Sequence, residues 1–263
     1  MTRSYDFDRF PDPRRRSEIA RLQRQAGVLI ERELTMLEAL GLRPDARFLE
    51  LGCGPGFLCG AVAGALAQGC ATGLDASADL LAVARSVVLP EHPNLVFVRG
   101  EAAALPFADA SFDFAYSRLV FQHLAEPGAA LRELRRVLRP GGRLCVLDID
   151  DGWLSLHPPC AAFEALHARA CEAKLRQGGD RKVGRKLGSW LRAAGFYEVG
   201  VRVEALSSID LGIEDFLDLT TRFKAQHFDP EEGRALLAQL DQELRVADHP
   251  VGLCGIFVAS GRA

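Results

Sequence analysis

The most chemically specific feature of this chain is a set of three glycines at alternate positions, Gly52, Gly54 and Gly56. They follow a short apolar run and open a stretch of small residues that predicts a helix. Glycine lets the backbone turn tightly and lie against a ligand with no side chain between them. Nicotinamide and flavin sites use a further glycine three residues after the second, where this chain has Phe57. The loop therefore predicts a nucleotide-like cofactor that lays an amino-acid portion, not a phosphate, along the backbone.

Acidic residues follow the next apolar runs. Asp75 ends the run at residues 71–74, nineteen residues after Gly56. A carboxylate at the carboxyl end of a strand can accept hydrogen bonds from both hydroxyls of a ribose, although a helix cap is the alternative for Asp75 taken alone. The segment at 94–102 then ends in Glu101 and Ala102, and segments at 111–118 and 137–144 continue the alternation of strand and helix.

The motif Glu50-Leu51-Gly52-Cys53-Gly54-Pro55-Gly56 and the segments after it resemble the class I S-adenosylmethionine-dependent methyltransferase family, in its ubiquinone/menaquinone-type and natural-product branch that acts on small molecules. The similarity is dense over residues 47–151 and weaker over residues 187–196. It implies S-adenosyl-L-methionine as cofactor and S-adenosyl-L-homocysteine as product. Glu101 stands where the family has the shorter Asp. The implied cofactor-binding residues are Glu50, Gly52, Cys53, Gly54, Gly56, Asp75, Ala76, Glu101, Ala102, Ser117, Arg118 and, from the N-terminal helix, Gln25.

Methyl transfer from a sulfonium is an in-line displacement, so the protein must align the reactants in a dry pocket and, for a protonated nucleophile, take up a proton. Acceptor-side residues are expected after the fourth and fifth strands. We name His123 first as general base, because imidazole titrates near neutral pH; a structural role is its alternative. The other candidates are Tyr116 and Asp148, followed by Asp150, Asp151 and His157. Asp148, Asp150 and Asp151 with Trp153 are also expected to form an acidic and aromatic rim for a cationic or polar acceptor, or else a solvated loop.

The elements that must position these residues alternate between apolar strands and helices, which predicts an α/β, doubly wound, Rossmann-like fold. The resemblance implies a seven-stranded sheet with an antiparallel last strand. We expect a single domain, with an N-terminal helical segment at 1–45, a cofactor-binding core at 46–151 and an acceptor-side cap at 152–263 that carries lid helices and the last strands.

A lid is expected from two parts of the chain. The first is the N-terminal segment with Tyr5, Phe7 and Phe10 and the long helix at 17–40, where Arg21 or Gln25 is a candidate for the methionine carboxylate. The second is the set of helices at 209–247, inserted before the last strand. Candidates there for an acceptor carboxylate are Arg222, Lys224 and His227, with surface exposure as the alternative.

Composition and charge limit the classes of partner. The chain has 263 residues, 48% apolar and 25% charged, with a formal charge of −3, so no broad basic surface for nucleic acid or membrane is expected. The basic clusters at 14–16, 181–182 and 185–186 are expected to be solvated. Residues 1–16 lack the apolar core of a signal peptide, so we expect a cytoplasmic protein. The seven cysteines contain no C-x-x-C pair and are expected to be reduced core residues. His157, Cys160, His167 and Cys171 fit no compact zinc site, and no metal is expected.

Three other functions are alternatives to this one. An RNA or protein methyltransferase is disfavoured because Ser117-Arg118-Leu119-Val120 replaces the Asn-Pro-Pro-Tyr of the amino-methylating nucleic-acid enzymes, and no basic domain is added. A nicotinamide oxidoreductase is disfavoured by Phe57. A protein that binds the cofactor without methyl transfer stays open, since its cofactor site would look the same. The acceptor, the choice among O-, N- and C-methylation and the oligomeric state also stay open.

Overall fold

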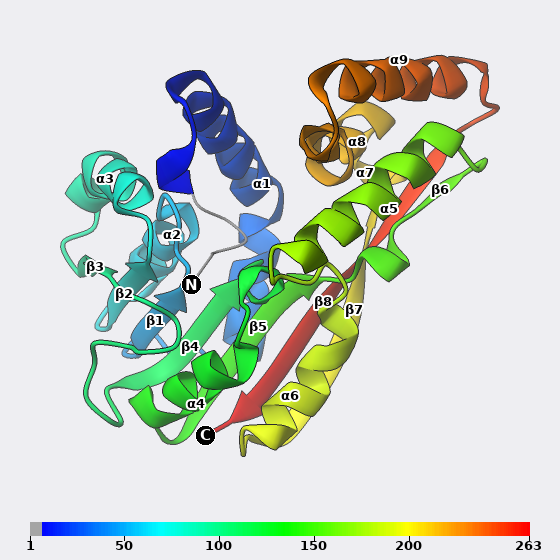
Figure 1. Cartoon of the computed structure of the whole chain (residues 1–263). Coiled ribbons are helices and arrows are strands. Elements are labelled where there is room, and N and C mark those ends of the chain that lie inside the picture. Colours follow the sequence, from blue (N-terminus) through cyan, green and yellow to red (C-terminus); the bar gives the residue numbers. More distant parts are fainter. Residues whose placement is uncertain (1–6) are drawn as a thin grey trace.

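The computed structural model describes residues 7–263, apart from the side chains of Arg9, Pro13, Gln25 and Val28. Its centre is an eight-stranded sheet in the order β3-β2-β1-β4-β5-β8, in which β6 and β7 also pair with β8 (Figure 1). The strands are β1 (Arg47–Leu51), β2 (Cys70–Asp75), β3 (Leu95–Arg99), β4 (Phe112–Arg118), β5 (Leu138–Ile149), β6 (Ser155–His157), β7 (Tyr197–Ser207) and β8 (Val251–Arg262). The first five are parallel, and β8 is antiparallel to β5, as predicted. The doubly wound α/β fold is confirmed.

The short strand β6 was not predicted. It pairs with Val251–Leu253 of β8, just beyond Ile256, where the pairing of β5 with β8 ends. Three residues, Ser-Leu-His, are too few to show an alternating pattern, so the sequence carried no signal for it.

Helices cover both faces of the sheet because successive strand residues point to opposite sides. One face, with Phe48, Phe114 and Tyr116, packs against α1, α2, α3, α5 and the helices before the last strand. The other face, with Leu49 and Ala115, packs against α4 and α6. The helices are α1 (Asp12–Ala39), α2 (Phe57–Ala65), α3 (Ala78–Val87), α4 (Pro127–Val137), α5 (Ala161–Arg176), α6 (Leu187–Ala193), α7 (Ser208–Leu211), α8 (Ile213–Thr220) and α9 (Pro230–Val246).

Local sequence explains where key helices begin. Gly56, in the left-handed region at φ 79°, starts α2 directly after the glycine loop. The Ser77 side chain accepts a hydrogen bond from the Leu80 N–H and caps α3, and Asp229 caps α9 in the same way. Short 3-10 helices complete the loops: η1 (Phe7–Arg9), η2 (Leu89–Glu91), η3 (Phe121–His123), η4 (Asp151–Trp153), η5 (Gly184–Lys186) and η6 (Arg222–His227).

The helices before the last strand form a projection with α5 at the upper right of Figure 1. This projection is anchored, because Phe216, Leu217 and Leu240 are fully buried and belong to the same apolar cluster as the sheet residues. Tyr5, which we expected in the lid, lies outside the described residues. Within residues 7–263, no helix has the length and apolar character needed to cross a membrane.

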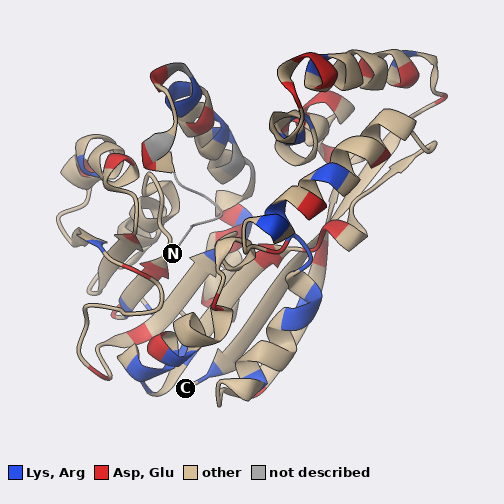
Figure 2. Ribbon diagram, viewed as in Figure 1, with Lys and Arg blue, Asp and Glu red and all other residues tan. Residues whose placement is uncertain are grey.

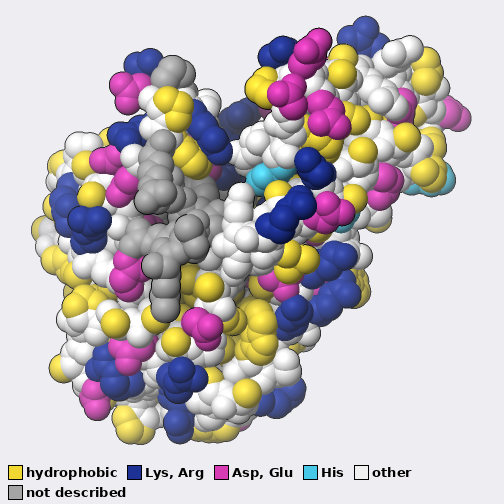
Figure 3. All heavy atoms as spheres, viewed as in Figure 1, with side chains coloured by type: hydrophobic (Ala, Val, Ile, Leu, Met, Phe, Trp, Pro, Cys, Tyr) yellow, Lys and Arg dark blue, Asp and Glu magenta, His cyan; other side chains and the backbone are white. Residues whose placement is uncertain are grey.

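Charged residues of both signs are interspersed along the helices (Figure 2). On the face shown in Figure 3, Lys and Arg side chains occur in small groups among Asp and Glu side chains and do not merge into one basic patch.

Candidate functional site

A cavity of about 920 Å³ lies at the carboxyl ends of the central strands, between that edge of the sheet and the helices α1 and α5 and η6. In open α/β sheets, ligands bind at this edge. Sites for one small molecule usually measure about 300–1,000 Å³, so this cavity lies near the upper end of that range. It has room for a cofactor and a second small molecule.

The glycine loop forms one wall of the cavity. The Gly52 and Cys53 N–H groups donate to the Leu74 carbonyl oxygen at 2.7 and 3.0 Å, which fixes the loop against β2. Gly54 has φ 54° and a Cβ there would meet nothing within 4 Å, so backbone conformation, not crowding, favours glycine at this position. The loop thus leaves open space beside its backbone, as a close-lying ligand requires.

Asp75 sits beside this loop at the end of β2 and lines the cavity. Its Oδ2 accepts from the Gly54 N–H and its Oδ1 from the Ser77 N–H, both at 2.8 Å. Burial raises the pKa of Asp75, while these backbone donors act to lower it. A carboxylate has about four acceptor positions, so its backbone partners leave acceptor capacity for hydroxyl groups. Ala76, Glu101 and Ala102 line the same part of the cavity.

Glu50, on β1, is 3% exposed and also lines the cavity. Its Oε2 has no hydrogen-bond partner among the described residues. Burial raises the pKa of Glu50 to about 8, although Arg118 acts to lower it. A buried polar atom without a partner costs roughly 1–3 kcal/mol. An amino group from a ligand would satisfy this oxygen.

The side chains at the ends of β4 and β5 are bonded mostly to other groups of the protein. Tyr116 is fully buried and donates its hydroxyl to Glu33 Oε2 at 2.9 Å, and the same Glu33 accepts from Arg118 Nε at 2.7 Å. Asp148 accepts from the Gln122 and Ile149 N–H groups at 3.1 and 2.8 Å, and burial raises its pKa to about 7. Arg118 lines the cavity, whereas Tyr116, Ser117 and Asp148 do not. Direct contact of these three side chains with a ligand is therefore disfavoured.

His123, at the end of η3, does line the cavity, and its Nδ1 lies 2.6 Å from Lys174 Nζ of α5. Burial first, and then the charges of Lys174, Arg181 and Arg21, hold the pKa of His123 well below its usual value. Burial and Arg181 lower the pKa of Lys174 to about 7, against the opposite effect of Asp148 and Asp151. His123 is therefore a neutral imidazole at physiological pH, and the charge on Lys174 determines which ring nitrogen carries the proton.

The predicted acidic rim is wrong. Asp148, Asp150 and Asp151 are 0%, 0% and 2% exposed. Two of them pair with cations from distant parts of the chain: Asp150 with Arg185 Nη2 at 2.6 Å, and Asp151 with Arg181 Nε at 2.5 Å and Lys224 Nζ at 3.2 Å. Trp153 is exposed and packs edge-on against Phe257. Of these four side chains, Asp151 alone lines the cavity.

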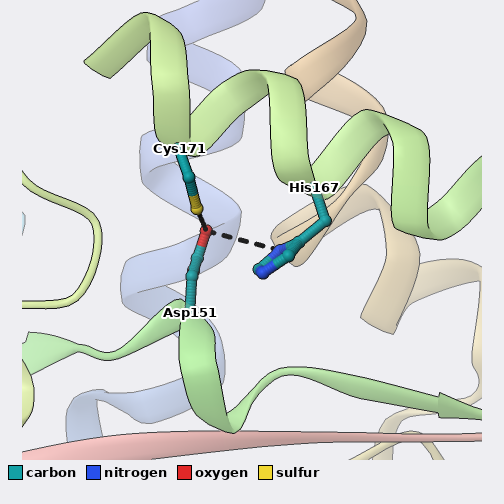
Figure 4. Close-up of side chains that lie close together, drawn as sticks. All are labelled: Asp151, His167 and Cys171. Carbon is teal, nitrogen blue, oxygen red and sulfur yellow. Dashed lines mark hydrogen bonds and ion pairs between the residues drawn. The ribbon is translucent and has the colours of Figure 1, made fainter. Parts of the chain in front are cut away.

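Asp151 is the centre of a polar cluster with His167 and Cys171 (Figure 4). One ligand atom from each residue lies within 4.8 Å of the others, which is a spacing that could hold a metal ion. His167 and Cys171 both come from α5, but His157 and Cys160 are not part of this group. Lys224 Nζ lies 3.2 Å from both Asp151 Oδ2 and His167 Nδ1. Because protein cations already neutralise Asp151, the cluster acts as an ionic junction between η4, α5 and η6.

The helical wall of the cavity carries residues that the sequence named as candidates and others that it did not. Phe10, Arg14, Glu18 and Arg21 of the N-terminal part line it, as do Lys174, Arg181 and His227. The expectation that the basic clusters are solvated is wrong for Arg181, which is buried, whereas Arg14 is exposed and also faces the cavity. Arg222 does not line the cavity; it pairs with Glu214, Asp218 and Asp241. The Gln25 side chain lies outside the described residues.

Part of the chain matches a known protein family. Residues 49–146 match the family described as "Methyltransferase domain". Malonyl-[acyl-carrier protein] O-methyltransferase of Pseudescherichia vulneris is 38% identical over 151 residues, 57% of this chain and 55% of that protein. Demethylmenaquinone methyltransferase of Beutenbergia cavernae is 38% identical over 133 residues, half of each chain. The structure of phosphoethanolamine N-methyltransferase 2 of Haemonchus contortus with S-adenosyl-L-methionine has the same fold, with a TM-score of 0.57 and 19% identity over 88% of this chain and 52% of that one. The chain spans about half the length of the curated relatives it matches.

Proposed function

We propose, from the premise that the core of this chain belongs to the class I S-adenosylmethionine-dependent methyltransferase family, that the protein transfers a methyl group from S-adenosyl-L-methionine to a small-molecule acceptor. The observation that carries the proposal is the placement of the glycine loop, Asp75 and the unsatisfied Glu50 Oε2 on one wall of a cavity with room for a second molecule. α1, α5 and η6 line the opposite side of this cavity, an arrangement that suits a small acceptor better than a macromolecule.

The residues on this wall fit the family's cofactor. The backbone of the loop at 52–56 would hold the methionine portion, Glu50 the amino group and Asp75 the ribose hydroxyls. Glu101 and Ala102 would lie beside the adenine. When bound, S-adenosyl-L-methionine supplies a methyl group on a positively charged sulfur, which needs no further activation by the protein. The chain's own tasks are to align the acceptor, exclude water and remove a proton where the nucleophile carries one.

His123 is the proposed general base for a protonated nucleophile. When Lys174 is charged, it donates to His123 Nδ1, so the ring proton lies on Nε2 and that nitrogen cannot accept another. When Lys174 is neutral, it can accept from Nδ1–H, and the Nε2 lone pair is available. Asp148 is proposed as a positioning residue, because it accepts from the Gln122 N–H and so holds the η3 turn that ends in His123. Tyr116 is proposed to position Glu33, which in turn holds Arg118.

Calorimetric binding of S-adenosyl-L-homocysteine tests the proposal without knowledge of the acceptor. A charged hydrogen-bonding group is worth roughly 1.5–3 kcal/mol, so Asp75→Ala should weaken binding about ten- to a hundredfold. Asp109→Ala is the matched control, since Asp109 is exposed and pairs with Arg136 away from the cavity. Failure of the wild-type protein to bind would refute the proposed function, and unchanged affinity in Asp75→Ala would remove Asp75 from the site.

A further inference from the structure

The two walls of the cavity differ in charge. Among the described residues, the wall at the strand ends carries three carboxylates, Glu50, Asp75 and Glu101, and one cation, Arg118. The opposite wall, from α1, α5, η4 and the loop after α5, carries two carboxylates and five cations: Glu18 and Asp151 against Arg14, Arg21, Lys174, Arg176 and Arg181. An acidic wall suits a positively charged methyl donor. A cationic wall suits an anionic group.

The cations converge from three segments onto one region. The guanidinium groups of Arg21 and Arg181 both lie over the Phe223 ring, 5.3 and 5.4 Å from its centroid. Arg14 reaches from α1 to the Gln226 side chain of η6 and also covers the Phe10 ring. Lys174 contacts His123 at the inner end of the group. Glu18 pairs with Arg21 and Asp151 with Arg181, and among the described residues that line this wall the five cations outnumber the two carboxylates.

Burial and the charges of these cations lower the pKa values of two histidines. Burial is the largest cause of the low pKa of His227, about 4, and Arg181, Lys174, Arg14 and Lys224 lower it further. The pKa of His123 is lowered by burial and by three cations of the same group. A wall that resists a further positive charge is stabilised by a bound anion.

The cavity is also lined by a set of apolar side chains, here called its floor. The floor is formed by side chains from the sheet and from the surrounding helices: Leu22, Ala26, Leu29, Leu147, Ile149, Leu206, Leu219 and Ile256. Most of a ligand that enters would therefore be in contact with hydrocarbon, with its charge at one end.

We propose that the acceptor of the methyl group has an apolar body and one anionic group, a carboxylate or a phosphate, which binds between Lys174, Arg14 and Arg181. The proposal rests on the proposed function, because it assigns the second molecule in the cavity. Arg14 contributes directional donors to the anion, and Arg181, held by Asp151, contributes long-range charge. Lys174 contributes an N–H donor in either protonation state, because a neutral amine keeps two N–H groups while its lone pair accepts from His123 Nδ1–H. The apolar body lies on the floor and orients the reacting atom toward the methyl donor.

Four probes with one chain length and different head groups test this proposal: octanoate, octyl phosphate, octanol and octylamine. Their affinities are measured by calorimetry below micelle-forming concentrations, on protein saturated with S-adenosyl-L-homocysteine. We expect at least one anionic probe to bind about tenfold or more tightly than octanol, and octylamine to bind most weakly. Preference between octanoate and octyl phosphate identifies the anionic group.

Variants separate direct recognition from general effects. Lys174→Gln and Arg14→Gln should each weaken the anionic probe about tenfold or more and leave octanol unchanged. Arg14 is exposed, so its variant is expected to fold even if Lys174→Gln does not. Lys186→Gln, which removes an equal charge outside the cavity, is the control. The proposal is overturned if octylamine binds as well as the anions, or if both variants bind the anions like wild type. It is also overturned if the anions bind only when S-adenosyl-L-homocysteine is absent, because the cations would then serve the donor's own carboxylate. Failure of S-adenosyl-L-homocysteine itself to bind would instead refute the proposed function.

Discussion

Lys174 and His123 form the pair of residues whose protonation decides whether the cavity contains a base. Burial, and then the charge of Arg181, lower the pKa of Lys174, whereas Asp148 and Asp151 raise it. Lys174 contacts His123 directly. With a Lys174 pKa of about 7, the lysine donates to Nδ1 below this pH and can accept from it above. The Nε2 lone pair of His123 therefore becomes available as a base when the pH rises.

Nitrogen-15 chemical shifts of the His123 ring should show this change. We expect the Nε2–H tautomer at pH 6 and the Nδ1–H tautomer at pH 8, with no imidazolium at either pH, because the His123 pKa is well below its usual value. Lys174→Met should abolish the pH-dependent exchange. His123→Ala should lower turnover roughly a hundred- to ten-thousandfold if a proton must be removed. A single tautomer throughout this range would contradict the account of the pair.

Glu50 should couple binding of the methyl donor to proton release. At pH 7 this residue is mostly protonated, because its pKa is about 8. A nearby positive charge favours the carboxylate, so binding of S-adenosyl-L-methionine should release up to about one proton. Calorimetry at pH 7 in buffers of different ionisation enthalpy measures the release. Glu50→Gln should lose this proton release. Equal release in the variant would show that another group titrates on binding.

At the scale of elements, the cavity has a polar boundary where α1 meets the helical projection. Its contacts include the exposed polar groups Arg24 and Asp218 at 3.4 Å and Arg14 with Gln226, and the Arg21 guanidinium over the Phe223 ring. Exposed ion pairs contribute roughly 0–1 kcal/mol. By contrast, α8 and α9 are held by buried Phe216, Leu217 and Leu240. We therefore expect the motion of the lid at the boundary between α1 and η6, and not throughout residues 209–247.

Hydrogen exchange can locate this motion. With S-adenosyl-L-homocysteine bound, exchange should slow in the first half of α1 and in η6, whose side chains line the cavity, and change little in the middle of α9. Exchange that is the same with and without ligand in both α1 and η6 would contradict a closing boundary there.

The elements were largely predictable because their signals are local. Apolar runs and the glycine loop placed most of the strands and helices within a few residues. The cationic wall was not predictable, because a lysine on a helix such as Lys174 shows no sequence difference between facing water and facing a cavity. The acidic run at 148–151 suggested a rim because its partners Arg181, Arg185 and Lys224 are distant in the sequence, so the sequence does not show that they pair with it.

At the scale of the whole molecule, charges of the two signs are segregated onto different walls inside the cavity, while the face in Figure 3 is mixed. Nucleic-acid binding depends on extended basic surfaces and falls steeply with salt. The mixed charge on the face in Figure 3 therefore does not favour RNA bound across that face.

The most direct test of the central claim is transfer of label from methyl-labelled S-adenosyl-L-methionine in a cell extract, with Asp75→Ala at the same donor concentration as the control. We predict that label enters the small-molecule fraction and that the control loses most of this label. Passing the extract over an anion-exchange resin before the reaction should remove the acceptor, and with it most of the transfer. Label found in RNA or protein, or no transfer above the control in any fraction, would contradict the account.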